Sequence, residues 1–247
     1  MNASQVGVPA LARATSTFRK IEIELPPLPV QRRIAAVLGA LDDKIELNRK
    51  MNANLEAQAQ TLFKSWFVDF APWGGKMPKE WKMGTLGELV TVCYGKDHKK
   101  LADGAIPVFG SGGLMRYAEK ALFDQESVLI PRKGSLNNIM YADKPFWTVD
   151  TMFYTKMKMK NAAKYVYLFL HGKDMSSLNT GSAVPSMTTD ILNAKKVIVP
   201  SENGLSEFEC KLNPMFKMIA ANAAESRKLA ETRDALLPKL MSGEVEA

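Results

Sequence analysis

Residues 30–70 read VQRRIAAVLGALDDKIELNRKMNANLEAQAQTLFKSWFVDF, and apolar side chains recur within this stretch at alternating spacings of four and three residues. Such a seam, sustained for about five heptads, predicts a long helix with one face made for a partner helix. Prolines at 26, 27 and 29 disfavour an earlier start, and the cluster at 71–75 is typical of a helix end. The predicted central helix spans 30–72, and its seam residues are Ile34, Leu38, Leu41, Ile45, Asn48, Leu55, Leu62 and Trp66.

The same pattern recurs 174 positions later, and a second helix is predicted over 205–247. A period of this length is too long for a solenoid unit, so it indicates two copies of a module made of a domain and a helix. We expect Pro214 and Pro238 to interrupt the second helix or to mark its first and last turns. The seam positions of the second copy that match those of the first are Ile219, Asn222, Leu229 and Leu236.

Each seam carries an asparagine in its central part, Asn48 in one and Asn222 in the other. A buried asparagine at such a position costs stability and fixes the register of paired helices. Because the two helices flank one globular segment, the simplest arrangement folds them back as an antiparallel coiled coil. The alternative is two independent amphipathic helices packed on the globular segment, and their length, roughly 55–60 Å for the first, argues against it.

The segment between the helices, 76–200, lacks helical periodicity for most of its length. Enrichment in β-branched and aromatic residues predicts strands over 85–94, 127–132, 146–157 and 195–199, and an apolar run predicts a helix over 161–172. The predicted fold class is α+β, with one globular mixed domain flanked by two long antiparallel coiled-coil helices. Residues 1–29 then form the remnant of a preceding domain.

The formal net charge of the chain is +7, and segment 76–200 carries the whole excess, with 18 Lys and Arg against 11 Asp and Glu. A basic domain between neutral helices suits a polyanionic partner, although a lysine-rich surface kept for solubility is the plainer interpretation. No run of 18 apolar residues and no signal peptide is present, which excludes a membrane span and predicts a cytoplasmic location. The two cysteines, far apart in the chain, are expected to be reduced thiols.

Four polar, glycine-rich loops are predicted in this basic segment, over 94–100, 109–117, 131–138 and 179–189. Lys and Arg side chains neutralise phosphates. Hydrogen bonds from Ser, Thr and backbone N–H groups to the phosphates fix the register of the protein on the DNA. Arg can recognise guanine, and Asn can recognise adenine. One such loop alone is as well explained as a plain turn, but four of them together favour nucleic-acid binding. The candidate DNA-binding residues are Lys96, His98, Lys99, Lys100, Ser111, Arg116, Arg132, Lys133, Ser135, Asn137, Asn138, Ser182, Thr188 and Thr189.

Motifs for catalysis are not found in this sequence. Gly110-Ser111-Gly112-Gly113 is not a dinucleotide fingerprint, and no Walker A sequence occurs. The two histidines and two cysteines stand at spacings that do not make a metal site. We therefore expect no catalytic residue, no metal and no resident cofactor.

Three stretches carry a resemblance to a known family: Leu25-Pro-Pro-Leu-Pro-Val-Gln-Arg-Arg-Ile34, Phe146-Trp-Thr-Val-Asp-Thr-Met-Phe153 and Gly181-Ser-Ala-Val-Pro-Ser-Met187. Together they resemble the specificity (S) subunit of type I restriction–modification systems, over nearly the whole chain. The start of the second helix departs from the family pattern, because it has Pro200-Ser-Glu-Asn in place of the proline-rich glutamine-arginine signature.

The resemblance implies a non-catalytic subunit whose target-recognition domain, 76–200, reads half of a bipartite site on double-stranded DNA. It implies that the helices dock methyltransferase (M) subunits and, through them, restriction (R) subunits. S-adenosylmethionine, ATP and Mg then belong to those partner subunits. With one complete recognition domain in the chain, we expect a homodimer to restore two.

The alternatives are the specificity module of another bipartite DNA-modifying system and a coiled-coil scaffold with an inert basic domain. A third, a DNA-modifying enzyme in its own right, is disfavoured by the missing cofactor and metal motifs. Salt-dependent binding to duplex DNA without turnover separates a reader from an enzyme and from a scaffold.

Overall fold

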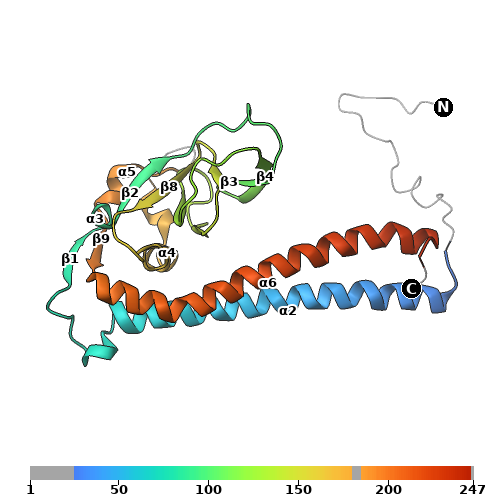
Figure 1. Cartoon of the computed structure of the whole chain (residues 1–247), viewed down its shortest axis with the longest axis horizontal. Helices are drawn as coiled ribbons and strands as arrows, with labels where there is room; N and C mark the ends of the chain where they lie inside the picture. The colour runs from blue at the N-terminus through green and yellow to red at the C-terminus, as the bar shows by residue number, and fades with distance from the viewer. Residues whose placement is uncertain (1–24, 180–184, 246–247) are drawn as a thin grey trace. The chain divides into compact units, whose positions relative to one another are not determined.

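A computed structural model describes residues 25–179 and 185–245, so the predictions made for 1–24 and for Ser182 lie outside the described residues. The described chain forms two compact units, one made of the residues up to Asn48 together with those from Ala224 onward, the other Arg49–Ala223. The helices α2 (Leu28–Phe67) and α6 (Glu202–Ser242) each contribute to both units (Figure 1).

In the first unit the two helices run antiparallel. Asn48 Nδ2 donates to Ser226 Oγ at 3.3 Å, while Asp42, earlier in α2, pairs with Arg233, later in α6, at 2.6 Å. Ile34 and Leu240 are both buried at the end of this pair. Partners that advance along one helix as they recede along the other are the signature of an antiparallel pair.

The second unit continues the same arrangement through different contacts. Asn52 Nδ2 donates to the Ile219 carbonyl at 3.2 Å, and Asn222 Nδ2 donates to Asn52 Oδ1 at 2.8 Å. Trp66 packs on Phe208 with ring centroids 5.5 Å apart. The predicted antiparallel pairing is confirmed in each unit, and two independent helices are excluded. The predicted seam residues are all buried or half-buried.

Helix α2 begins at Leu28 and ends at Phe67, where 30–72 is predicted, and α6 begins at Glu202, where 205 is predicted. A further difference concerns one proline. Helix α6 runs without a break through Pro214, so the expected interruption there is wrong. A proline removes one backbone donor and hinders the carbonyl four residues earlier, here that of Cys210. Both Cys210 and Pro214 are exposed, so water can satisfy that carbonyl. After α2 the chain turns through a short 3₁₀ helix, Ala71–Trp73, where Phe70 and Gly74 have positive φ angles of 51° and 63°.

The rest of the second unit is an α+β domain, as predicted. Its sheets have the strand orders β1-β9, β2-β8-β5-β6 and β4-β3-β7, with β3 and β7 parallel and the other pairs antiparallel. The strands are β1 (Lys82–Thr85), β2 (Val90–Tyr94), β3 (Ile106–Gly110), β4 (Gly113–Ala118), β5 (Ser127–Pro131), β6 (Met140–Ala142), β7 (Trp147–Thr148), β8 (Met152–Met157) and β9 (Lys196–Val199). The helices are α3 (Leu86–Leu89), α4 (Ala163–His171) and α5 (Thr189–Asn193), with a 3₁₀ helix η2 (Met175–Leu178).

Three of the predicted segments need correction. The strand expected over 85–94 is divided by α3, because the Glu88 carboxylate accepts the Thr85 N–H at 3.0 Å and starts a helical turn. The strand expected over 146–157 is broken by a turn between β7 and β8. The loop expected over 109–117 is mostly a hairpin, since β3 and β4 pair up to Gly110 and Gly113.

The main core of the second unit is aromatic and centres on Phe67 at the end of α2. Its ring contacts Tyr165 of α4, Trp81 and Phe208, with centroid separations of 4.6, 5.1 and 4.8 Å. Helix α4 is buried along almost its whole length, from Ala163 to Leu170. The core therefore packs α4 and Trp81, which precedes β1, against the paired ends of α2 and α6.

Candidate nucleic-acid interface

Loops from distant parts of the sequence meet at one end of the β2–β8–β5 sheet. Arg132, just after β5, donates its backbone N–H to Thr151 at 2.8 Å and its Nη1 to the Asp150 carbonyl at 3.0 Å. The Arg132 guanidinium also lies over the Tyr94 ring, 5.4 Å from its centre. These contacts join the loop after β2, the loop after β5 and the turn before β8.

The tip of the β3–β4 hairpin belongs to the same cluster. Asn138 Nδ2 donates to the Ser111 carbonyl at 2.9 Å. Gly134 has φ +85°, and a Cβ atom there would lie 3.0 Å from Ser111 Oγ, so glycine suits this position best. The Gly134 N–H donates to the Pro185 carbonyl at 3.0 Å. The described part of the last predicted loop thus joins the cluster too.

Lys96 is anchored by its backbone at the cluster. Its N–H donates to the Thr148 carbonyl and its own carbonyl accepts Trp147 Nε1, both at 2.9 Å. A Cβ at Gly95 would lie 2.0 Å from the Val149 carbonyl oxygen, so only glycine allows this close approach. The side chains of Lys96, Lys99, Lys100 and Lys133 are exposed. The structure therefore brings the four predicted loops together and leaves several of their cations facing solvent.

One carboxylate stands among these cations. Asp97 Oδ1 accepts the backbone N–H of Lys99 at 3.0 Å. This hydrogen bond holds the pKa of Asp97 below its usual range. Asp97 therefore stays ionised and shapes the basic loop by an Asx-type turn.

Several predicted site residues also have structural partners. Arg116 Nη2 donates to the Leu101 carbonyl at 2.7 Å and pairs with Asp103 at 3.5 Å, which ties the loop before β3 to β4. Asn137 Oδ1 accepts the Met175 N–H at 2.7 Å, at the start of η2. Thr188 accepts the Ile191 N–H and begins α5. Their DNA contacts stay predictions, as do those of the remaining candidates His98, Ser135 and Thr189.

Four apolar side chains that no sequence motif marked are exposed in this part of the domain. Leu114, Met115 and Tyr117 lie on β4, and Tyr94 lies at the end of β2. The sequence predicts a glycine-rich loop where β4 lies. A loop does not imply that side chains alternate between two faces, so no exposed face is expected there. Interpreting Gly110–Gly113 as a hairpin tip would have drawn attention to two adjacent exposed apolar residues.

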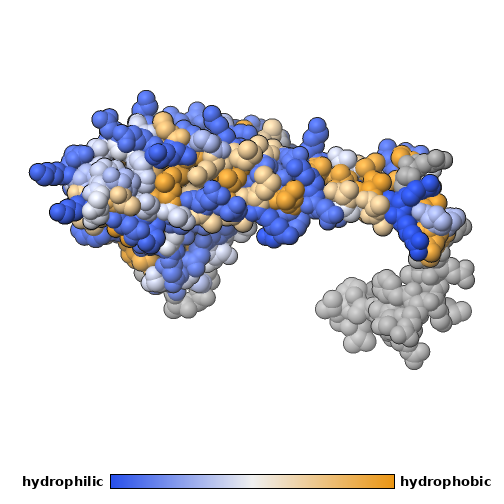
Figure 2. All heavy atoms as spheres, turned by 90° about the horizontal axis from the view of Figure 1, so that it is seen from below, coloured by the Kyte–Doolittle hydropathy of each residue, from blue (hydrophilic) through white to orange (hydrophobic). Residues whose placement is uncertain are grey.

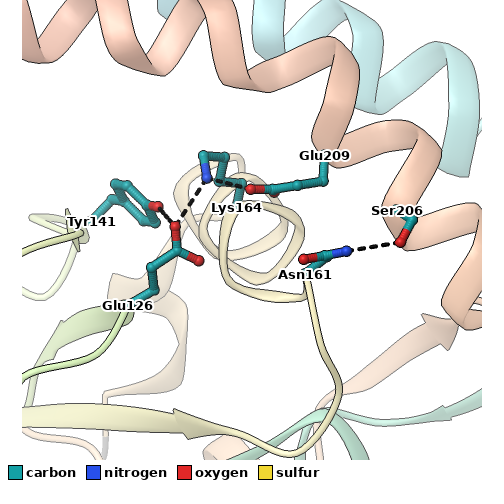
Figure 3. A network of polar contacts seen from close by, with 6 residues as sticks. All are labelled: Glu126, Tyr141, Asn161, Lys164, Ser206 and Glu209. Atoms are coloured by element: carbon teal, nitrogen blue, oxygen red, sulfur yellow. Dashed lines mark hydrogen bonds and ion pairs between the residues drawn. The ribbon is translucent and has the colours of Figure 1, made fainter.

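A buried lysine fixes the domain on α6. Lys164 of α4, whose side chain is 5% exposed, pairs with Glu209 of α6 at 2.5 Å and with Glu126 at 3.1 Å (Figure 3). Tyr141 donates to the same Glu126 at 2.6 Å. Asn161 Nδ2 donates to Ser206 Oγ of α6 at 2.8 Å beside this network. Burial raises the pKa of Glu209, and the Lys164 ammonium opposes that shift.

Two further features, a metal-ligand cluster and a membrane-spanning helix, are not found in the described part of the chain. No group of three or more His, Cys, Asp or Glu side chains there has the arrangement of a metal site. Likewise, none of the described helices is long and apolar enough to cross a membrane.

Comparison with known proteins gives concordant matches. A family model described as "Type I restriction modification DNA specificity domain" matches residues 4–57 and 78–204. The type I restriction enzyme MjaIX specificity subunit of Methanocaldococcus jannaschii is 28% identical over an alignment of 268 residues. The alignment covers 93% of this chain and 62% of that protein. The HindI specificity subunit of Haemophilus influenzae is 22% identical over an alignment of 317 residues, which covers 91% of this chain and 69% of that protein.

A solved structure shares the fold. The type I restriction–modification S subunit from M. genitalium superposes with a TM-score of 0.65 at 21% identity, over 87% of this chain and 61% of that one. The chain thus spans less than two thirds of the length of the MjaIX subunit and of this solved S subunit.

Proposed function

Because the chain belongs to the type I restriction modification DNA specificity family, we propose that its domain 76–200 reads one half of a bipartite site on duplex DNA. The observation that supports this best is the convergence of four polar, glycine-rich loops at one end of this basic domain, held together by the contacts of Arg132, Gly134 and Asn138. In this role the chain is a non-catalytic subunit. S-adenosylmethionine, ATP and Mg belong to the subunits that it recruits.

The salt dependence of DNA binding tests this proposal. Lys96 and Lys133 are exposed cations on backbones fixed at the loop cluster. If both neutralise phosphates, the variant K96A/K133A should flatten the slope of log K against log salt by up to about 1.8, at about 0.9 for each phosphate that is no longer neutralised. Fluorescence anisotropy with a mixed-sequence duplex measures this slope.

A matched control removes the same charge elsewhere on the domain. Lys160 follows β8 and Lys196 begins β9, and both side chains are exposed. β8 pairs with β2 so that Met157 lies opposite Val90, at the other end of the ladder from Tyr94. The variant K160A/K196A should therefore keep the wild-type slope. Equal slopes for all three proteins would contradict the placement of DNA at the loop cluster.

We propose further that the helix pair docks methyltransferase subunits and, through them, restriction subunits. Figure 2 shows hydrophobic surface among hydrophilic surface on the molecule. On the helices, Leu47, Met51 and Met218 are exposed. Leu47→Lys should weaken association with the methyltransferase subunit in analytical ultracentrifugation and leave the salt slope of DNA binding unchanged. Met83→Lys, on an exposed apolar residue of β1, is the control. Wild-type assembly by the Leu47 variant would contradict this use of the helices.

A bipartite site needs two readers, and we propose that two copies of the chain supply them as a homodimer. The support is the repeated seam pattern of the two helices that flank the recognition domain, which gives the helix pair two similar halves. Two-fold pairing would place identical readers on an interrupted palindrome. Light scattering should give a mass near twice 27.3 kDa at micromolar concentration. A constant monomer mass would mean that the helices pair only within one chain.

A further inference from the structure

The β3–β4 hairpin carries a bulge that turns two adjacent apolar side chains outward. Val108 pairs with Arg116 and Phe109 with Leu114, so Met115 has no partner on β3. In a regular strand neighbouring side chains point to opposite faces, and one of two consecutive residues is covered. Here Leu114 and Met115 are 46% and 56% exposed. A bulge that re-aims side chains is a feature typical of functional sites.

These two side chains lie beside the loop cluster. Ser111, at the hairpin tip, is held by Asn138 at 2.9 Å. The Met115 side chain packs against Gly110: a Cβ atom added at Gly110 would lie 2.5 Å from the Met115 sulfur and 3.7 Å from a methyl group of Val149. Met115 is therefore close to Val149 as well. Lys96 is bonded to Thr148, next to Val149, and Lys133 precedes Gly134, which approaches Ser111. The backbones of two exposed lysines from two other loops are therefore held near the bulge.

An apolar pair among cations fits one class of partner better than others. A protein partner for an apolar patch would not require the basic surroundings, whereas duplex DNA offers apolar base surfaces between rows of phosphates. Leucine and methionine are among the side chains that enter a groove against a base step or a thymine methyl. The charge of segment 76–200, with 18 Lys and Arg against 11 Asp and Glu, matches the polyanion.

We propose that Leu114 and Met115 are specificity-determining residues that contact bases directly, while Lys96 and Lys133 contact the flanking phosphates. This assignment rests on the proposed DNA-reading function. It divides the interface into an apolar part that distinguishes sequences and a cationic part that does not. The edge position of β4 in the β4-β3-β7 sheet leaves the outer side of the strand open for this contact.

The test uses the full chain and a library of duplexes with a randomised central segment. Wild-type protein should enrich a subset of sequences, and affinity for that subset relative to the unselected library is the readout. L114S/M115S should lower this ratio by at least about fivefold, the effect of removing one good base contact. Its salt slope should stay that of the wild type, because every phosphate-binding lysine is still present. L114M/M115L, which keeps apolar side chains, should retain most of the ratio.

The outcomes separate this proposal from the function on which it rests. Salt-dependent DNA binding with an unchanged ratio in L114S/M115S overturns the base contact and leaves the proposed function standing. Absence of salt-dependent binding by the wild type overturns both. A lower mass for L114S/M115S in light scattering, with an unchanged ratio, would assign the bulge to contact between copies instead. Met83→Ser, an exposed apolar residue of β1, controls for loss of surface hydrophobicity, and circular dichroism confirms folding.

Discussion

The two ends of the helix pair carry residues that correspond through the sequence repeat, yet their surroundings differ. The aromatic end has Trp66, Phe67 and Phe208, and the positions 174 residues away, Leu240, Met241 and Ile34, form the aliphatic end. The seam pair is buried at both ends, Trp66 with Phe208 and Leu240 with Ile34. The next position differs, because Phe67 is 3% exposed and Met241 is 53% exposed. The repeat thus specifies the helix seam, whereas contacts with the domain decide what is buried beside it.

Polar contacts follow the same division. Glu209, which pairs with buried Lys164, corresponds through the repeat to Ala35, which is exposed. In the middle of the helices the repeat maps Asn48 onto Asn222 and Asn52 onto Ser226. The contacts Asn48–Ser226 and Asn222–Asn52 are therefore two copies of one interaction, one in each unit. The seam is duplicated, but the ionic attachment of the domain is not.

The largest effect is expected from truncating equivalent residues at the two ends. Phe67→Ala should lower the free energy of unfolding by about 3–5 kcal/mol, because removing a ring that touches Trp81, Tyr165 and Phe208 leaves a cavity. Met241→Ala should cost below about 1 kcal/mol, since its side chain already faces water. Urea denaturation of both variants measures the difference. Equal losses would contradict the unequal burial of the two ends.

Removing the lysine from the ionic attachment should have the next largest effect. Lys164→Met leaves Glu209, whose side chain is 12% exposed, and the more exposed Glu126 without their ammonium partner, for a cost of about 3 kcal/mol. Lys160→Met is the control, because its side chain is exposed. Urea denaturation again provides the measurement. A Lys164 variant as stable as the wild type would mean that hydrophobic packing alone holds α4 on α6.

The features that the sequence predicted well are those that rest on a pattern repeated over many residues. The seam of α2 repeats over many turns, so its pairing with α6 followed from spacing alone. Short elements were not predicted where a local hydrogen bond changed the structure within a longer predicted strand. Thr85-Leu-Gly-Glu88 has the spacing of a capping box, and that signal explains why a turn of helix divides the predicted strand.

The candidate site was predictable in composition but not in its internal geometry. Four polar, glycine-rich loops were the predicted site, and the structure brings their described parts together, while their contacts with phosphates stay predictions. The sequence did not show that Arg116 and Asn137 bond to the protein itself, because their partners depend on the fold. Lys164 was hidden in the same way, since its partners Glu126 and Glu209 are 38 and 45 residues distant.

A smaller effect is expected for the duplicated asparagine contact. Asn222→Leu removes the donor to Asn52 Oδ1 and should cost about 1–2 kcal/mol, while N52L/N222L should cost less than the two single variants added together. Ser226→Ala, in the other copy, should cost less than Asn222→Leu, because Asn48 also donates to Glu225 at 2.8 Å. A double-mutant cycle on thermal unfolding measures the coupling. Strict additivity would show that the two asparagines do not stabilise each other.

The smallest expected effect is a pH dependence at the aromatic end, where Glu209 lies. Burial raises the pKa of Glu209 above its ordinary value of 4.5, while Lys164 and Glu126 face the same carboxyl with opposite influences. A raised pKa in the folded state means that the folded protein holds this proton more tightly than the unfolded chain. The stability gained in this way is fully present below pH 4.5 and is lost as pH rises through the folded-state pKa.

Replacing this carboxyl by an amide tests the direction of the effect. Glu209→Gln should abolish the dependence, so that the stability of the wild type relative to the variant falls as pH rises above 4.5. Glu207→Gln, an exposed neighbour on α6, controls for the loss of one charge. Urea denaturation at a series of pH values gives the answer. A wild type that gains stability over the Glu209→Gln variant with rising pH would show that the ion pair with Lys164 outweighs burial.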